Sequence, residues 1–196
     1  MTPIVVGRGL ACRRGAHTVL RGVDLSVGAG QCLALCGANG SGRTTLLEVL
    51  STLRAPGAGT LEINGIDAVR SPRRARVHVA LASADVTRGD GLTVREYLRI
   101  VHDARGGAGA APALEVAGAL ERARLRGEVP VDQLSRGQLA QLALTTALMV
   151  RPPLVLLDDP FASLDPEART RFIDWIVRSE EHTSELQSLA YLVCRL

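Results

Sequence analysis

The chain has 196 residues, of which 46% are hydrophobic, and carries a formal net charge of +3. This length supports one well-filled α/β core, or a core with a small appended subdomain, and argues against two independent domains. All 23 basic residues are arginines, but their charge is too dispersed to predict a nucleic-acid partner. No run approaches the roughly 18 apolar residues that a membrane-spanning helix needs. We therefore expect a soluble protein whose role at a membrane depends on a partner.

The cysteines and histidines form no recognisable site. The four cysteines lack metal-ligand spacing, and Cys32 and Cys36 fall in an apolar run, so we expect small core residues in a reducing compartment. His17, His78 and His102 match no motif and are interpreted as surface or structural residues.

The first half of the chain predicts strands around one helix. Residues 4–27 alternate apolar and polar positions, with turn signals at Gly15 and Gly22, which indicates short antiparallel strands. Residues 31–36 are apolar enough for a strand buried on both faces. A glycine-rich loop follows, Thr44 opens a helix that stops before Pro56, and residues 59–64 predict another strand and turn.

The second half predicts helices and one acidic strand. Helical spacing covers residues 93–105 and 112–126, with a glycine and alanine loop between them. A third helix covers about 136–150, and residues 154–159 form a second buried strand with acids at its carboxyl end. The order is strand, glycine loop, helix, inserted helices and acidic strand.

The glycine loop has the spacing of a phosphate-binding loop. It follows G-x-x-x-x-G-K-[ST] except that Arg43 replaces the lysine, and it lies between a strand and a helix. Backbone amides of such a loop and the helix N-terminus bind phosphate, and the Thr44 hydroxyl and Asp158 are candidate Mg²⁺ ligands. The alternative is a glycine-rich turn without a ligand. The candidate phosphate-binding residues are Gly37, Asn39, Gly40, Ser41, Gly42, Arg43, Thr44 and Thr45.

Residues 134–138, Leu-Ser-Arg-Gly-Gln, precede the acidic strand by some twenty positions and resemble the LSGGQ signature of ATP-binding-cassette (ABC) ATPases. Taken alone, this segment could be an ordinary helix N-cap. The family's D-loop is matched by residues 163–165, and residues 92–98 resemble the LTVxExL segment that begins its helical subdomain. The resemblance covers residues 4–177.

The resemblance implies an α/β P-loop NTPase core of ABC type, with an N-terminal antiparallel β subdomain and a helical subdomain at about 86–133. It implies ATP and Mg²⁺ as cofactors and a head-to-tail dimer, either homo- or heterodimeric. In such a dimer Ser135, Gly137 and Gln138 would complete the nucleotide site of the other subunit. It also implies transmembrane permease partners and a peripheral place on the cytoplasmic face of the cell membrane.

Four positions depart from the family pattern. Arg43 keeps the charge of the missing lysine, but its planar fork is longer. Asp159 stands where the family has the glutamate that polarises water, and its carboxylate lies one methylene further back. The family's Q-loop glutamine falls at Ser83 or Ala84. Arg14 replaces the aromatic residue that stacks on adenine, although arginine can also stack on a purine.

Residues 178–196 differ in composition from the rest of the chain and resemble the translation of a sequencing-library adapter. The alternative is an ordinary amphipathic C-terminal helix. We expect an ABC ATP-binding domain over 1–177, C-terminally truncated, followed by a non-native tail over 178–196 in which His182 is not the family's switch histidine.

The resemblance therefore implies the ATP-binding subunit of an ABC membrane transporter, with Asp159 and Arg43 as candidate catalytic residues. The alternative is a degenerate cassette that binds nucleotide without turnover and regulates an active partner.

Overall fold

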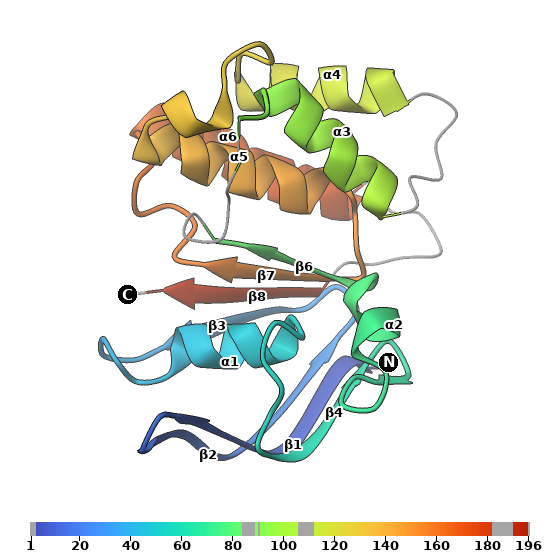
Figure 1. The fold of residues 1–196 in the computed structure, drawn as a ribbon, viewed down its shortest axis with the longest axis vertical. Helices are drawn as coiled ribbons and strands as arrows, with labels where there is room; N and C mark the ends of the chain where they lie inside the picture. Colours follow the sequence, from blue (N-terminus) through green and yellow to red (C-terminus); the bar gives the residue numbers. More distant parts are fainter. Residues whose placement is uncertain (1–2, 84–88, 90, 106–111, 182–189, 196) are drawn as a thin grey trace. The chain divides into compact units, whose positions relative to one another are not determined.

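The structure is a computed structural model that describes residues 3–83, 89, 91–105, 112–181 and 190–195 (Figure 1). The chain divides into two compact units, each of which is described by itself. Unit 1 comprises Met1–Leu81, Pro152–Asp159 and Thr183–Leu196, and unit 2 comprises Ala82–Arg151 and Pro160–His182. Within the described ranges, no helix combines the length and the apolar character needed to cross a membrane.

An antiparallel sheet opens unit 1. Its strand order is β2-β1-β4-β5, and it is formed by β1 (Pro3–Arg14), β2 (His17–Gly28), β4 (Ala58–Ile63) and β5 (Ile66–Asp67). The predicted antiparallel strands are thus confirmed, but β1 and β2 are each 12 residues long rather than short.

Of the two predicted turns in residues 4–27, the structure confirms only the one at Gly15. That residue has a φ of 58° and joins β1 to β2. Gly22, with a φ of 68°, lies inside β2, where the register with β1 shifts from the Leu10–Val23 pair to the Cys12–Leu20 pair. Between these pairs Ala11 of β1 opposes Arg21 and Gly22 of β2, so Gly22 marks a β-bulge and the predicted turn was wrong.

The second sheet has the order β3-β8-β7-β6. It contains β3 (Cys32–Cys36), β6 (Val79–Ala82), β7 (Leu154–Asp158) and β8 (Ala190–Arg195), and β8 pairs in parallel with both β3 and β7. Strand β7 is buried along Leu154–Leu157, as its unbroken apolar sequence predicts for a strand covered on both faces.

The prediction that β3 is buried on both faces was wrong. Leu33 and Leu35 are half-buried, whereas Cys32, Ala34 and Cys36 are exposed. The strand lies at the edge of its sheet, and the described residues cover only one of its faces. Cys32 and Cys36 are therefore not the core residues that the apolar run suggested, although Cys12 is.

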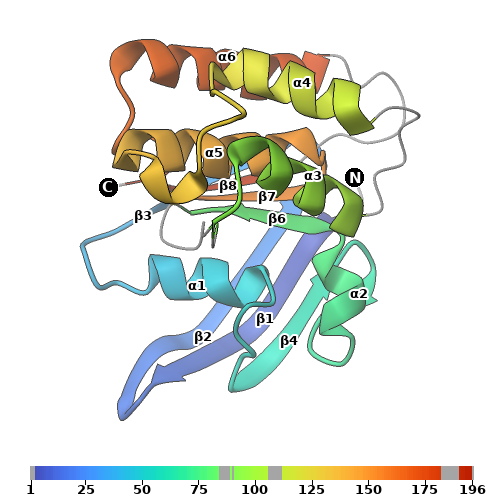
Figure 2. The same cartoon turned by 45° about the horizontal axis from the view of Figure 1, so that its top comes forward.

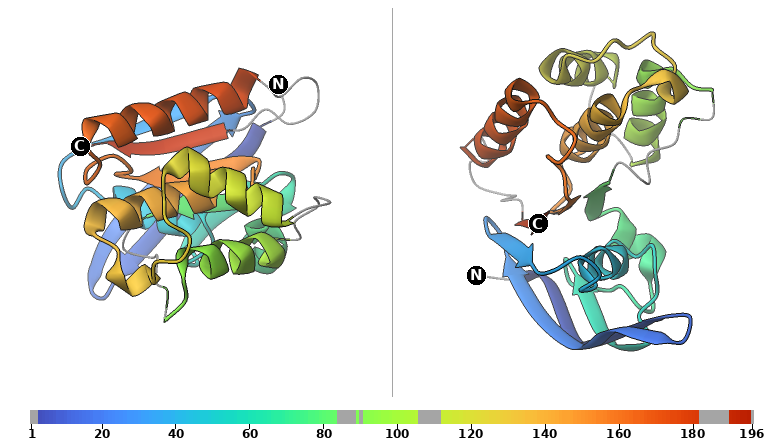
Figure 3. Two further views of the ribbon diagram at one scale, coloured as in Figure 1. Left: turned by 90° about the horizontal axis from the view of Figure 1, so that it is seen from above. Right: turned by 90° about the vertical axis from the view of Figure 1, so that its left-hand side faces the viewer.

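Helix α1 (Arg43–Leu50) lies along the antiparallel sheet in unit 1 (Figure 3, right). Its residues Leu46, Leu47, Val49 and Leu50 join side chains of β1, β2, β4 and β7 in one apolar core. Burial of such side chains contributes about 1.5–3 kcal/mol each. This core holds the N-terminal end of α1 at a fixed place beside β7. A short helix α2 (Pro72–Arg76) occupies an arginine-rich segment.

Unit 2 is helical: α3 (Val94–Ala104), α4 (Pro112–Ala123), α5 (Arg136–Met149), α6 (Pro166–Glu181) and the 3-10 turn η1 (Val131–Gln133). Helices α3, α4 and α5 match the predicted segments within a few residues, whereas α6 was not predicted. Figure 2 shows α4 beside α6, where Phe172 is fully buried and stacks on Trp175 with ring centroids 5.9 Å apart.

Candidate functional site

The glycine loop joins β3 to α1 and leaves the start of that helix open. Gly40 and Gly42 have φ angles of 82° and 97°, a region that other residues adopt only with strain. A Cβ on Gly42 would fall 2.9 Å from Val19 Cγ1, so the loop passes directly against the β1–β2 hairpin. No described side chain caps the helix at Gly42, and its N-terminal amides carry partial positive charge. The loop therefore has the features of an anion-binding site.

The predicted phosphate-binding residues all lie on this loop or in the first turn of α1. Residues 37–41 are exposed, whereas Thr45 is 4% exposed and packs into the core. The Arg43 side chain turns back to the loop, where its Nη2 donates to Asn39 Oδ1 at 3.3 Å. The Arg43 guanidinium therefore contacts the loop that was predicted to bind phosphate.

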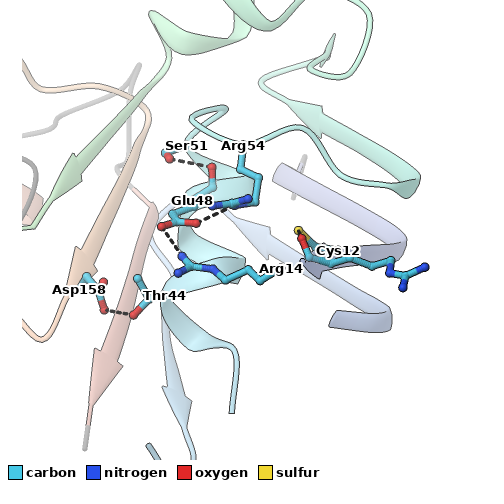
Figure 4. A network of polar contacts seen from close by, with 8 residues as sticks. Cys12, Arg14, Thr44, Glu48, Ser51, Arg54 and Asp158 are labelled. Atoms are coloured by element: carbon cyan, nitrogen blue, oxygen red, sulfur yellow. Dashed lines mark hydrogen bonds and ion pairs between the residues drawn. The ribbon is translucent and has the colours of Figure 1, made fainter. Parts of the chain in front are cut away.

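Thr44 and Asp158 meet although 114 residues separate them in sequence (Figure 4). The Thr44 hydroxyl donates to Asp158 Oδ1 at 3.3 Å, which brings the first turn of α1 to the carboxyl end of β7. A hydroxyl and a carboxylate are the oxygen ligands that Mg²⁺ takes, usually as one or two protein groups beside phosphates and water. The described residues contain no cluster of three or more histidine, cysteine, aspartate or glutamate ligands.

Asp159 directly follows β7 and is exposed, with a φ of 46°. Asp and Asn are the non-glycine residues that most readily adopt this left-handed region. An aspartate at position 159 therefore fits the local backbone better than most residues would. The backbone is extended at Asp158, the last residue of β7, and left-handed at Asp159.

Arg14, the predicted base-stacking residue, forms an ion pair that its sequence position did not suggest. Its Nη2 donates to Glu48 Oε1 at 2.6 Å, and Arg54 Nε donates to Glu48 Oε2 at 2.8 Å (Figure 4). Burial alone would raise the pKa of Glu48, but the hydrogen bonds and charges of Arg54 and Arg14 outweigh it and hold that pKa below its usual value. The β1 end is thus fastened to α1 just behind the glycine loop.

The signature-like residues lie in unit 2, at the start of α5. Ser135 Oγ accepts from the Gln138 amide at 3.2 Å, and Gln138 Oε1 accepts from the Ser135 amide at 2.9 Å. This capping box explains why the segment begins a helix, as the N-cap interpretation predicted. A Cβ on Gly137 would fall 2.8 Å from the Ser163 carbonyl oxygen, so a glycine permits the close approach of the two segments.

A cavity of about 560 Å³ in unit 2 brings these residues together with the D-loop-like segment. Sequence reasoning named five of its lining residues and missed the charged residues Arg124, Glu167 and Arg171. Glu167 pairs with both arginines, and Arg171 Nη2 donates to the Ala123 carbonyl at 3.4 Å. The Arg124–Glu167 pair and the Arg171 contact with Ala123 join the end of α4 to α6, and no local pattern in the sequence indicates them. The Glu167–Arg171 pair lies within α6, at i,i+4 spacing. The lining residues are Arg124, Ser135, Gly137, Gln138, Gln141, Ser163, Asp165, Glu167 and Arg171.

The candidate residues thus form two groups, one in each unit. The phosphate-loop residues, Thr44, Asp158, Asp159 and Arg14 lie in unit 1, and Ser135, Gly137 and Gln138 lie in unit 2. Ser83, a candidate Q-loop position, is 9% exposed, and Ala84 lies outside the described residues.

Comparisons with known proteins agree with this arrangement. The family model described as ABC transporter matches residues 20–162. The chain is 36% identical over 170 residues to a Nod factor export ATP-binding protein I of Ralstonia nicotianae, covering 86% of this chain and 53% of the relative. It is 35% identical over 168 residues to a cytochrome c biogenesis ATP-binding export protein CcmA of Rhodopseudomonas palustris, covering 85% of this chain and 80% of that protein.

The solved structure of an ATP-binding subunit of an ABC transporter superposes with a TM-score of 0.86 at 25% identity, over 98% of this chain and 80% of that one. The chain spans about half the length of the Nod factor export relatives that it matches. The family match covers well over half of the chain and includes the glycine loop, the acidic strand and the signature-like residues. The chain therefore belongs to the ABC transporter family.

Proposed function

We propose that the chain is the ATP-binding and ATP-hydrolysing subunit of an ABC membrane transporter, which energises translocation of a substrate. The observation that carries this proposal is the 3.3 Å contact of Thr44 with Asp158, beside an uncapped helix N-terminus. That geometry offers a place for a triphosphate and its metal ion at one end of β7.

In this proposal the triphosphate lies on the amides and side chains of the loop and of the first turn of α1. Arg43 provides a cation for its terminal phosphates, and the Thr44 hydroxyl with the Asp158 carboxylate would hold Mg²⁺. When bound, the ion neutralises phosphate charge during cleavage. The phosphate-binding set is Gly37, Asn39, Gly40, Ser41, Gly42, Arg43, Thr44 and Thr45.

Asp159 is the candidate residue for positioning the attacking water, because it follows the proposed metal ligand directly and is exposed. Ser135, Gly137 and Gln138 are proposed to contact the nucleotide of a second ATP-binding domain in a head-to-tail dimer. A helix N-terminus that begins with a hydroxyl side chain is suited to an anion from another molecule.

The names of the relatives support a proposal for the partners and location of the protein. The two relatives described above are named as ATP-binding proteins of export, which supports transmembrane permease subunits as partners of this chain. We therefore propose a peripheral location on the cytoplasmic face of the cell membrane. We propose that the ABC domain is 1–177, with its helical subdomain at about 86–133. Residues 178–196 are proposed to be an adapter-derived tail, and sequencing the gene across codon 178 tests that assignment.

The decisive experiment measures binding and turnover on the same purified chain. A fluorescent ATP analogue titrated with and without Mg²⁺ reports binding, and release of inorganic phosphate reports hydrolysis. We expect both activities, with Asp158→Asn lowering the Mg²⁺ dependence of binding and Asp159→Asn abolishing release. Binding without release, unrestored by Arg43→Lys combined with Asp159→Glu, would contradict the hydrolytic function, and absence of nucleotide binding would contradict the whole proposal.

A further inference from the structure

Positive charge is concentrated in residues 69–77 of unit 1, which lie between β5 and β6. Four arginines fall within seven positions there, and residues 68–82 contain no aspartate or glutamate. The segment includes helix α2, which packs against β5. Its four positive charges exceed the net charge of +3 on the whole chain. The arginines are Arg70, Arg73, Arg74 and Arg76.

Most side chains of this segment are exposed. Within α2 Ala75 is the buried residue, whereas the three arginines of the helix are exposed. Val69 is 43% exposed and Val77 is 52% exposed, one at each end of the segment. Residues 69–77 therefore form a surface that combines cations with two apolar side chains, which we call the arginine patch.

Hydrogen bonds fix both ends of the arginine patch. Asp67 Oδ1 accepts from the amides of Val69 and Arg70 at 3.0 Å each. Arg76 donates to the Thr52 hydroxyl at 3.0 Å and to the Thr52 carbonyl at 2.9 Å, which fastens α2 to the residues that follow α1. Because the backbone is already held, little ordering is needed when the patch meets a partner.

The other three arginines are available to bind an anion. Arg70 Nε lies 3.6 Å from Asp67 Oδ2, but both side chains are mainly exposed, so this pair is weak. The side chains of Arg73 and Arg74 form no ion pair or hydrogen bond with any residue that the structure describes. Their charge is therefore not neutralised within the described part of unit 1.

Phosphate is the group that this surface suits best. Guanidinium groups bind phosphate oxygens through two parallel hydrogen bonds. Clusters of about four or more cations are attracted to the anionic lipids of a cytoplasmic leaflet, and apolar side chains beside them enter the boundary between headgroups and acyl chains. Nucleic acids also present phosphates, but proteins that bind single strands add aromatic rings, and residues 69–77 contain none. The two valines favour a lipid surface.

We propose that the arginine patch binds the anionic headgroups of a phospholipid bilayer. Arg70, Arg73 and Arg74 contact the lipid phosphates, and Val69 and Val77 contact the acyl boundary. This inference deepens the proposed location at the membrane, and in that respect it rests on the proposed function. It adds lipid to the permease as a partner of the chain. It uses no residue of the nucleotide site, so the two proposals can fail separately.

The test measures cosedimentation of the full chain with vesicles of phosphatidylcholine alone, or of phosphatidylcholine with about one third phosphatidylglycerol. We expect binding to the anionic vesicles alone, and release when the ionic strength is raised from about 0.05 M to about 0.5 M. Arg73→Gln combined with Arg74→Gln should lower the partition coefficient about fivefold for each arginine, or about 25-fold together. Arg73→Lys combined with Arg74→Lys should retain binding, because it keeps the charge.

Arg8→Gln combined with Arg21→Gln is the matched control, because it removes the same charge from two exposed residues of β1 and β2. It should change the partition coefficient by less than about twofold, since salt screens charges that lie outside the patch. Binding of the fluorescent ATP analogue should be the same in every variant, which shows that the chain stays folded.

Three results overturn the inference and leave the proposed nucleotide binding intact: equal binding to both vesicles, equal losses in the patch variant and the control, or no binding to either vesicle. Tighter binding to duplex DNA than to the anionic vesicles, lost in the same patch variant, also overturns it, because the patch is then a nucleic-acid surface. A chain that binds the anionic vesicles but not the ATP analogue keeps the lipid contact and refutes the proposed function.

Discussion

A methyl group added at Gly42 tests the contact between the glycine loop and the β1–β2 hairpin. In Gly42→Ala the new Cβ would lie 2.9 Å from Val19 Cγ1 and 3.2 Å from Leu20 Cδ2, on a backbone with a φ of 97°. Gly40→Ala is the matched control. Its φ is 82°, but no atom lies within 4 Å of the added Cβ.

The two variants share the cost of a left-handed backbone and differ in crowding. The strained φ should cost about 1–2 kcal/mol of unfolding free energy in either variant. Overpacking against Val19 and Leu20 should add about 1–3 kcal/mol in Gly42→Ala alone. We therefore expect Gly42→Ala to be the less stable of the two by about 1–3 kcal/mol.

Urea unfolding followed by far-ultraviolet circular dichroism measures both free energies, and the slopes must agree for the comparison to hold. A displaced loop should also weaken binding of the fluorescent ATP analogue more in Gly42→Ala than in Gly40→Ala. Equal stabilities within about 0.5 kcal/mol, the usual scatter of surface substitutions, would refute the close packing of loop and hairpin.

Three further predictions concern other contacts. His102 is 3% exposed, and its pKa is raised by hydrogen bonding to Asp103, opposed by burial and assisted by Glu115. Its charged form therefore stabilises the fold below pH about 6.5, and this stabilisation is lost as the pH rises through the raised pKa. In urea titrations, the stability advantage of the wild type over His102→Gln should shrink from about pH 5.5 to about pH 8. Thr44→Ala should raise the Mg²⁺ concentration needed for half-maximal nucleotide binding about tenfold, as the loss of a metal ligand does, whereas Thr44→Ser should restore it. Ser135→Ala should lower the unfolding free energy by about 1 kcal/mol in urea titrations, and a Ser135→Thr chain that is equally unstable would contradict the capping box.

Features that depend on neighbouring residues were predictable from the sequence. The glycine loop, the helix after it and the acidic strand each rest on local spacing, and α1 and β7 begin at or within one residue of the expected positions. The capping box at Ser135 is equally local. These are the elements for which periodicity and turn chemistry agree.

Features that depend on distant residues were not predictable. The apolar sequence of β3 does not indicate that the described residues cover only one face of this strand. In the sequence, Gly22 indicates a turn, and only the register of β2 with β1 shows that it marks a bulge. The Arg14–Glu48 pair spans 34 positions, and the Arg124–Glu167 pair joins the end of α4 to α6. Periodicity within one segment contains no information about such partners.

The close approach at Gly137 affects how sequence variation at this position is interpreted. Any side chain there would push a Cβ to 2.8 Å from the Ser163 carbonyl oxygen, which is backbone and cannot rotate away. A mutational scan under selection for folding alone would therefore already return mostly glycine at position 137. Invariance at this residue does not by itself identify a nucleotide contact, and only variants that compensate at the segment around Ser163 can separate the two requirements.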